Sequence, residues 1–333
     1  MAQSVLKEER LFLKVALMQG NLDPLQINKV SALLGIPADF VRKDYFVTQV
    51  IHALTKINDE YFELIFQGGT SLSKGYQVIK RMSEDVDFRV TQKSKKITLG
   101  KEARRKKLRD FRYTLISTLK NIGFAISDED TRVLYEGRFM SIQAKFPDSE
   151  KIAYLKPHIA IDCFFSELTL TPITKDITTL IKTTLGNECD HLTLPISCIA
   201  LDETAAEKWV ALTRRIANTQ KKSRLSDKDL VRHLYDLYQL KTNGLLTGAY
   251  TLLVHKIIEK DKAQFKKLND AYIENPIRES ALALDLLYND TQWKDHWHYF
   301  LEQMVYDENK PSFNKACMQL KLLSDEIFEV LKI

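Results

Sequence analysis

The stretch that decides the fold runs from residue 67 to residue 89 and reads QGGTSLSKGYQVIKRMSEDVDFR. It follows YFELIFQ (residues 61–67), whose aromatic and β-branched side chains favour a short buried strand. A Gly-Gly-Thr-Ser turn, a short helical pattern to about Lys80 and a second strand at Val86–Val90 come next. Two glycines let backbone amides approach a phosphate closely, and hydroxyl groups at the start of a helix add donors. The stretch therefore predicts a strand, a phosphate-binding turn, a helix and a second strand.

Two carboxylates stand at the head of that second strand. Asp85 and Asp87 are two residues apart, so their side chains point to the same side of a strand. Carboxylate oxygens on one face, beside a phosphate-binding turn, are suited to hold Mg²⁺ or Mn²⁺ on a nucleoside triphosphate. The pair therefore predicts a metal site for an NTP substrate.

A third acid, Asp162, lies within LKPHIAIDCFF (residues 155–165), which is otherwise typical of a buried strand. Asp162 shares a strand face with His158 and Ala160, and an acid in such a strand is costly unless it is paired or binds a metal. Asp162 is therefore the candidate third metal ligand. The alternative is an aspartate on the polar face of the strand, held by a nearby lysine or arginine.

These motifs resemble the nucleotidyltransferase toxin family named for the abortive-infection protein AbiEii, which is similar in turn to the DNA polymerase β-like superfamily. The first motif of that family is matched, in chain order, by Gly68, Gly69, Thr70, Leu72, Lys74, Arg81, Ser83, Asp85 and Asp87. The helix that usually precedes it is matched by Lys43-Asp44-Tyr45. Two later helical motifs are matched by Leu201, Glu203, Lys208, Ala211 and Arg215, and by Arg232, Tyr235, Asp236 and Leu237. The resemblance spans about residues 40–240, and His233 departs from it because the motif often has Asp there.

The resemblance implies an α+β fold: a polymerase β-like nucleotidyltransferase core with a mixed sheet, N-terminal helices and a helical C-terminal region. We expect a nucleotidyltransferase domain at residues 1–190 and a helical domain at 191–333. Asp85, Asp87 and Asp162 would bind the metal, and with Lys208 they would form the catalytic set. The phosphates would be bound by Gly68, Gly69, Thr70 and Ser71 and neutralised by Lys74, Arg81, Lys208 and Arg215. Asp236 would support one of these cations, or would be an acid on a helix surface.

Hydrophobic periodicity predicts further elements outside these motifs. Helices are expected near residues 11–18, 26–34, 38–55 and 101–121, strands at 131–135, 138–146 and 156–165, and helices almost throughout from residue 201. The four cysteines form no CxxC pair and are expected to be free thiols.

Positive charge is concentrated between Lys93 and Arg112, where ten Lys/Arg and two acids occur in a chain whose net charge is only +5. Such a block favours a polyanionic partner, and the alternative is an ordinary solvated helix face. Because the block follows the Asp85–Asp87 strand directly, we expect its charges near the mouth of the active site.

Together these features predict metal-dependent transfer of NMP from an NTP to an acceptor hydroxyl. The resemblance implies the toxin of a bacterial toxin–antitoxin and phage-defence pair, with a cognate antitoxin and a tRNA 3′ end as acceptor. Two alternatives remain: transfer to a protein hydroxyl, and a non-catalytic module that binds GTP or RNA. No apolar run approaches membrane-spanning length and the N-terminus is charged, so a cytoplasmic protein without a membrane partner is expected.

Overall fold

The computed structural model describes residues 22–94, 99–146, 155–221, 227–264 and 270–331. The chain divides into two units: unit 1 comprises Met1–Gln77 and Met82–Ile199, and unit 2 comprises Val78–Arg81 and Ala200–Ile333. The boundary expected after residue 190 falls before the last strand of unit 1. The helix expected near residues 11–18 lies outside the described residues.

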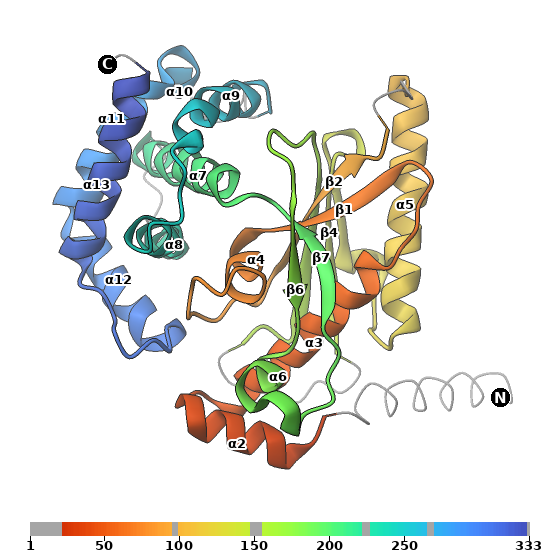
Figure 1. The fold of residues 1–333 in the computed structure, drawn as a ribbon. Coiled ribbons are helices and arrows are strands. Elements are labelled where there is room, and N and C mark those ends of the chain that lie inside the picture. The colour runs from red at the N-terminus through yellow and green to blue at the C-terminus, as the bar shows by residue number, and fades with distance from the viewer. Residues whose placement is uncertain (1–21, 95–98, 147–154, 222–226, 265–269, 332–333) are drawn as a thin grey trace, which may run out of the picture. The chain divides into compact units, whose positions relative to one another are not determined.

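The described strands of unit 1 form one mixed sheet (Figure 1), in the order β3-β4-β5-β2-β1-β7-β6. The parallel neighbours are β2 with β5 and β1 with β7, and the other neighbours are antiparallel. The strands are β1 (Phe62–Gln67), β2 (Val86–Gln92), β3 (Thr131–Leu134), β4 (Phe139–Lys145), β5 (His158–Phe165), β6 (Ile173–Ile177) and β7 (Leu194–Cys198). The mixed sheet and the α+β class are therefore confirmed, whereas β6 and β7 were not predicted.

The α-helices of unit 1 are α2 (Pro24–Leu34), α3 (Ala38–Thr55), α4 (Gly68–Lys74), α5 (Lys101–Asn121) and α6 (Leu180–Leu185). Helix α2 shows why the boundaries fall where they do. The Asp23 side chain accepts a hydrogen bond from the amide of Leu25, Pro24 occupies the first turn, and Gly35 ends the helix in a left-handed conformation. Helix α4 ends at Lys74, earlier than the predicted Lys80, and Val78–Arg81 belong to unit 2.

The two faces of the sheet differ sharply in polarity. On one face, Val86, Phe88 and Val90 of β2 and Ile159, Ile161 and Cys163 of β5 are fully buried. They form one apolar cluster with residues of α3 and α5, so both helices cover this face (Figure 1). Because side chains alternate along a strand, Asp87 and Asp162 point to the opposite face.

Helix α5 corrects one expectation. Leu108, Phe111 and Leu115 pack it on the apolar face, opposite the carboxylates. Its basic first half lies at the sheet end that carries Tyr61 and Phe165, where Lys107 sits 4.0 Å from the Tyr61 ring centroid. Asp87 is five residues from the end of β2, roughly 16 Å along the strand. Proximity along the chain had suggested that the basic block lies beside the carboxylates. The part of the block on α5 does not lie there.

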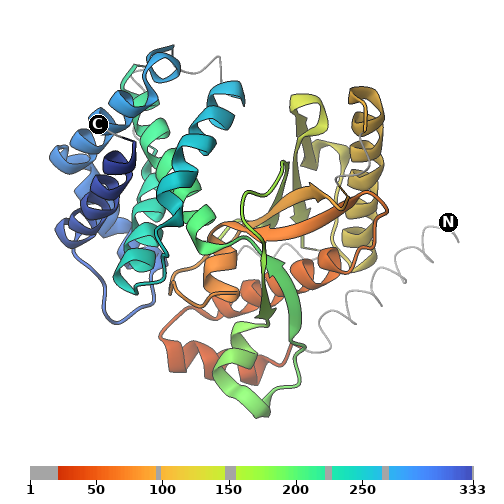
Figure 2. The ribbon, with the colours of Figure 1, turned by 45° about the horizontal axis from the view of Figure 1, so that its top comes forward.

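Unit 2 is helical, as predicted from residue 201 onward (Figure 2). Its helices are α7 (Leu201–Lys221), α8 (Val231–Thr242), α9 (Ala249–Gln264), α10 (Asp270–Glu274), α11 (Pro276–Asn289), α12 (Thr291–Met304) and α13 (Phe313–Val330). Trp209 of α7 is fully buried and donates to Ser324 of α13, which joins the first helix of the unit to the last. Across the described residues, no helix combines the length and the apolar character needed to cross a membrane.

Candidate active site

A row of polar side chains crosses the polar face of the sheet in unit 1. Strand register places Arg132 of β3 opposite Ser141 of β4, Ser141 opposite Asp162 of β5, Asp162 opposite Asp87 of β2, and Asp87 opposite Gln67 of β1. Neighbouring strands lie about 5 Å apart, so the two aspartates are direct neighbours. Like charges at this separation repel each other and favour binding of a cation.

The environment of Asp162 disfavours the charged form of its carboxyl group. Burial raises the pKa of its carboxyl above the ordinary value, nearby Asp85 adds to the rise, and a hydrogen bond with Ser141 opposes it. Its Oδ1 atom is buried and has no hydrogen-bond partner among the described residues. A buried acceptor without a partner destabilises a fold, so this atom is a site where a ligand would be stabilising.

Gly68 provides the space that the Asp87 side chain occupies. A Cβ atom at position 68 would lie 2.1 Å from Oδ2 of Asp87, and the backbone has a φ of +79°. Both facts require glycine at this position. The Thr70 hydroxyl, which is buried, hydrogen-bonds the backbone carbonyl of Asp85 and the Ser83 hydroxyl. The Gly-Gly-Thr turn thus fixes the positions of Asp85 and Asp87.

Gly68→Ala is expected to displace Asp87 and to lower the transfer rate by about 10²-fold, because small misplacements of reacting groups have effects of that size. The positive φ adds roughly 1–2 kcal/mol of destabilisation. The transfer rate and the melting temperature would be measured against Gly100→Ala, where a Cβ meets nothing within 4 Å and φ is negative. A Gly68→Ala protein with wild-type activity would contradict this role of the glycine.

Asp85 pairs with a lysine that sequence analysis did not identify. Lys156 Nζ lies 2.9 Å from Asp85 Oδ1 at the surface. Beneath them, fully buried Lys43 of α3 pairs with Glu84 at 2.5 Å. Burial lowers the pKa of the Lys43 ammonium, and the hydrogen bond to Glu84 opposes this fall.

In this arrangement, and within the part of the chain that is described, no three His, Cys, Asp or Glu side chains are gathered closely enough to hold a metal ion. Asp85 is instead engaged with Lys156. The metal site predicted at Asp85, Asp87 and Asp162 therefore stays a prediction.

Two other residues of the predicted phosphate site have protein partners. Lys74 Nζ lies 2.6 Å from Asp44 Oδ1 and also donates to the carbonyl of Thr178 at 3.2 Å, with little exposure. The buried Ser71 hydroxyl hydrogen-bonds the thiol of Cys198. These contacts join α4 to α3 and β7, and a phosphate contact by Lys74, Ser71 or Gly69 stays a prediction.

The remaining site candidates gather in unit 2. Arg81 donates two hydrogen bonds to Asp236, from Nε and from a terminal nitrogen, each at 2.8 Å, and Lys208 Nζ lies 2.8 Å from the same carboxylate. Asp236 is completely buried, which excludes the surface-acid alternative. Burial alone would raise its pKa, but the two cations hold the pKa of Asp236 well below its ordinary value. Arg81 and Lys208 thus share one buried carboxylate.

Arg215 and His233 adjoin this cluster without joining it. Arg215 pairs with Asp227 and is well exposed. Burial lowers the pKa of His233 well below its ordinary value, and Lys208 and Arg215 add to the fall. His233 is therefore neutral at pH 7, and it does not replace the charge of the aspartate that often stands there in the motif.

The chain is similar to known nucleotidyltransferase toxins. Residues 56–318 match the family described as "Nucleotidyl transferase AbiEii toxin, Type IV TA system". Among solved structures, the chain is similar to MenT4, a nucleotidyltransferase toxin from Mycobacterium tuberculosis H37Rv, with 16% identity and a TM-score of 0.35. That alignment covers 89% of this chain and 98% of the other. No curated protein matches the chain significantly.

Proposed function

We propose that this chain, which belongs to the family of nucleotidyltransferase AbiEii toxins of type IV toxin–antitoxin systems, transfers NMP from an NTP to an RNA hydroxyl in a metal-dependent reaction. Membership makes the chain a nucleotidyltransferase with an NTP substrate and a cognate antitoxin, so the non-catalytic alternative is set aside. The metal, the tRNA 3′ end as acceptor, a role in phage defence and a cytoplasmic location belong to the proposal.

The observation that carries the proposal is the neighbouring pair Asp87 and Asp162, with an unpartnered buried oxygen on Asp162. Mg²⁺ and Mn²⁺ prefer carboxylate oxygens, so these donors fit such an ion, with Asp85 as the third ligand. When bound, the ion would neutralise charge on the triphosphate and its transition state. The three aspartates would hold it, and the Gly68 turn keeps Asp87 in place.

Asp162 is also the proposed base for the acceptor hydroxyl. Its buried Oδ1 has no hydrogen-bond partner among the described residues, so it can accept a proton from the substrate. The hydroxyl would then attack the α-phosphorus, the bond to the leaving pyrophosphate would break, and the proton would pass to Asp162. In unit 2, Lys208, which shares Asp236 with Arg81, is the proposed phosphate contact, with Arg215 as a weaker candidate.

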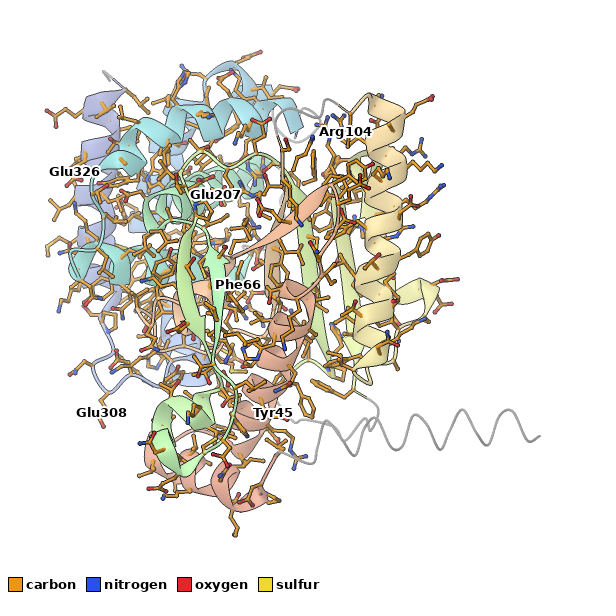
Figure 3. All side chains as sticks on the ribbon, turned by 45° about the vertical axis from the view of Figure 1, so that its right-hand side comes forward. Tyr45, Phe66, Arg104, Glu207, Glu308 and Glu326 are labelled. Carbon is orange, nitrogen blue, oxygen red and sulfur yellow. The ribbon has the colours of Figure 1, made fainter. Side chains whose placement is uncertain are left out.

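The acceptor is proposed to be a long RNA because the exposed positive charges of α5 lie away from the carboxylates. Lys101 is paired with Glu136, Arg104 lies over the Phe165 ring, and Lys107 lies over Tyr61. Arg105, Lys106 and Arg109 are exposed, and Figure 3 shows nitrogen-tipped side chains along the side of α5 that is turned away from the sheet. An RNA must be long enough to contact this strip and still present its end to Asp162.

Neutralising Arg105, Lys106 and Arg109 together with glutamine is expected to weaken tRNA binding and to flatten its salt dependence. Each lost phosphate contact lowers the slope of log K against log salt by about 0.7–0.9, so three contacts lower it by about 2–3. Fluorescence anisotropy of labelled tRNA over a salt series measures this, and NTP binding should stay within about twofold, since no NTP contact is removed. The control carries K256Q, K294Q and K315Q, which remove three exposed positive charges from unit 2. If the slope of log K against log salt is equal in both triple variants, the exposed side of α5 is an ordinary solvated helix face.

The second candidate function is transfer to a protein hydroxyl. The position of α5 on the apolar side of the sheet favours it, because the carboxylate face then lacks the basic block that would guide RNA to it. Incubation with α-labelled NTP and either total RNA or lysate protein separates the two acceptors. Label in RNA supports the proposal, and label confined to protein supports the alternative.

A further inference from the structure

Lys156 is held in place by both of its backbone groups. Its amide donates to Glu84 Oε2 at 2.8 Å, and its carbonyl accepts from Lys43 Nζ at 2.7 Å. The two side chains that hold it are themselves paired at 2.5 Å, with Lys43 completely buried and Glu84 nearly so. A buried ion pair thus fixes the position of a single exposed residue.

Such a pair is unfavourable to bury unless its remaining donors and acceptors are satisfied. Here Lys43 donates a further hydrogen bond to the backbone carbonyl of residue 156, and Glu84 accepts one from its backbone amide. Position 43 lies on the buried stripe of α3, three residues after Phe40 and four before Val47, where an apolar side chain would pack without this cost. The main local consequence of the charged pair is therefore the placement of Lys156.

The held residue directs its ammonium group at the first carboxylate of the DxD pair. Lys156 Nζ lies 2.9 Å from Asp85 Oδ1, where it neutralises one of three neighbouring acids. Glu84, one residue earlier, is already ion-paired with Lys43. Oδ1 of Asp85 can therefore bind a divalent cation only after Lys156 has moved away.

We propose that Lys156 is a built-in counter-ion of the carboxylate site, which occupies Asp85 until a divalent cation displaces it. The inference rests on the metal dependence proposed above. Because its backbone stays anchored to Glu84 and Lys43, the displaced ammonium remains tethered beside the site. An ion and the ammonium then compete for one carboxylate, so loss of the ammonium should strengthen metal binding.

The test is a Mn²⁺ titration of the full chain without NTP, in which free Mn²⁺ is measured by electron paramagnetic resonance. Lys156→Met should bind Mn²⁺ about three- to tenfold more tightly than the wild type, because a competing ion pair and a nearby like charge are both removed. Lys156→Arg keeps the charge and should stay within about twofold of the wild type. Lys145→Met is the matched control, because Lys145 lies on the same sheet face but pairs with Asp130.

The possible outcomes distinguish the counter-ion role of Lys156 from the metal dependence of the proposed function. Tighter binding by Lys156→Met alone supports the counter-ion role, which a merely structural lysine would not produce. Equal or weaker binding by Lys156→Met, with a wild type that binds Mn²⁺, overturns this inference and leaves the proposed function intact. If neither the wild type nor any variant binds Mn²⁺, metal dependence fails and the inference fails with it.

Discussion

Asp87→Asn is expected to lower the rate of NMP transfer by about 10²- to 10³-fold while the protein stays folded. Asparagine fills nearly the same space beside Gly68, so the close packing there persists, but the charge that faces Asp162 is lost. Pyrophosphate release and the melting temperature would be measured together. Asp176→Asn, an exposed acid on β6 of the same sheet, is the control and should keep full activity.

Asp162→Asn extends this prediction, because its two readouts should diverge. Activity should fall as in Asp87→Asn, whereas the melting temperature should hold or rise, since a buried charge with an unpartnered oxygen is removed. Loss of stability without loss of activity would instead make Asp162 a structural acid.

Asp236→Ala is expected to destabilise unit 2 by about 3–5 kcal/mol, the usual effect of leaving buried charges without their partner. Arg81 and Lys208 would then face each other, both nearly buried, with no carboxylate between them. For a unit of this size the loss corresponds to a melting temperature lower by roughly 10 °C. Calorimetry would measure it, with the exposed Asp325→Asn as control, expected within about 0.5 kcal/mol of the wild type.

A double variant and a pH series test the same cluster further. Adding Lys208→Met to Asp236→Ala removes one of the two cations left without a partner and should recover part of the stability.

The folded-state pKa of Asp236 is depressed. Its contribution to the free energy of unfolding is therefore fully present above the unfolded value of about 3.9 and is lost as the pH falls below it. The wild type should therefore lose stability below about pH 4 more steeply than Asp236→Ala. Equal acid sensitivity of the two proteins would contradict the pairing.

Elements with a strong local pattern could be predicted from the sequence. Ala38–Thr55, Lys101–Asn121 and the strands around Asp87 and Asp162 lie within a few residues of their expected bounds. The β6–β7 pair was missed because ITKDI carries two charges in five residues and β7 contains Pro195, which local rules exclude from a central strand. The structure accommodates Pro195 because β7 meets β1 only at Cys198, at its far end.

Partnerships across the chain could not be predicted in the same way. The position of Lys43 on an apolar helix stripe indicates that its ammonium group pairs with an anion. The local sequence does not identify Glu84 and the carbonyl of Lys156 as its partners. Proximity along the chain also gave a wrong position for the basic charges of α5, because a helix that follows a strand can pack on either face of the sheet. The apolar stripe of α5, once matched to the apolar side of β2 and β5, decides the face.

Metal-dependent transfer of NMP to RNA is tested by measuring pyrophosphate release and label transfer by the purified chain. Wild-type protein and Asp87→Asn would be incubated with each α-labelled NTP, Mg²⁺ and total tRNA, with and without EDTA. At least one NTP is expected to label tRNA with equimolar pyrophosphate, and EDTA or Asp87→Asn is expected to abolish both signals. Transfer by the wild type that is undiminished in EDTA, or equal transfer by folded Asp87→Asn, would contradict this expectation.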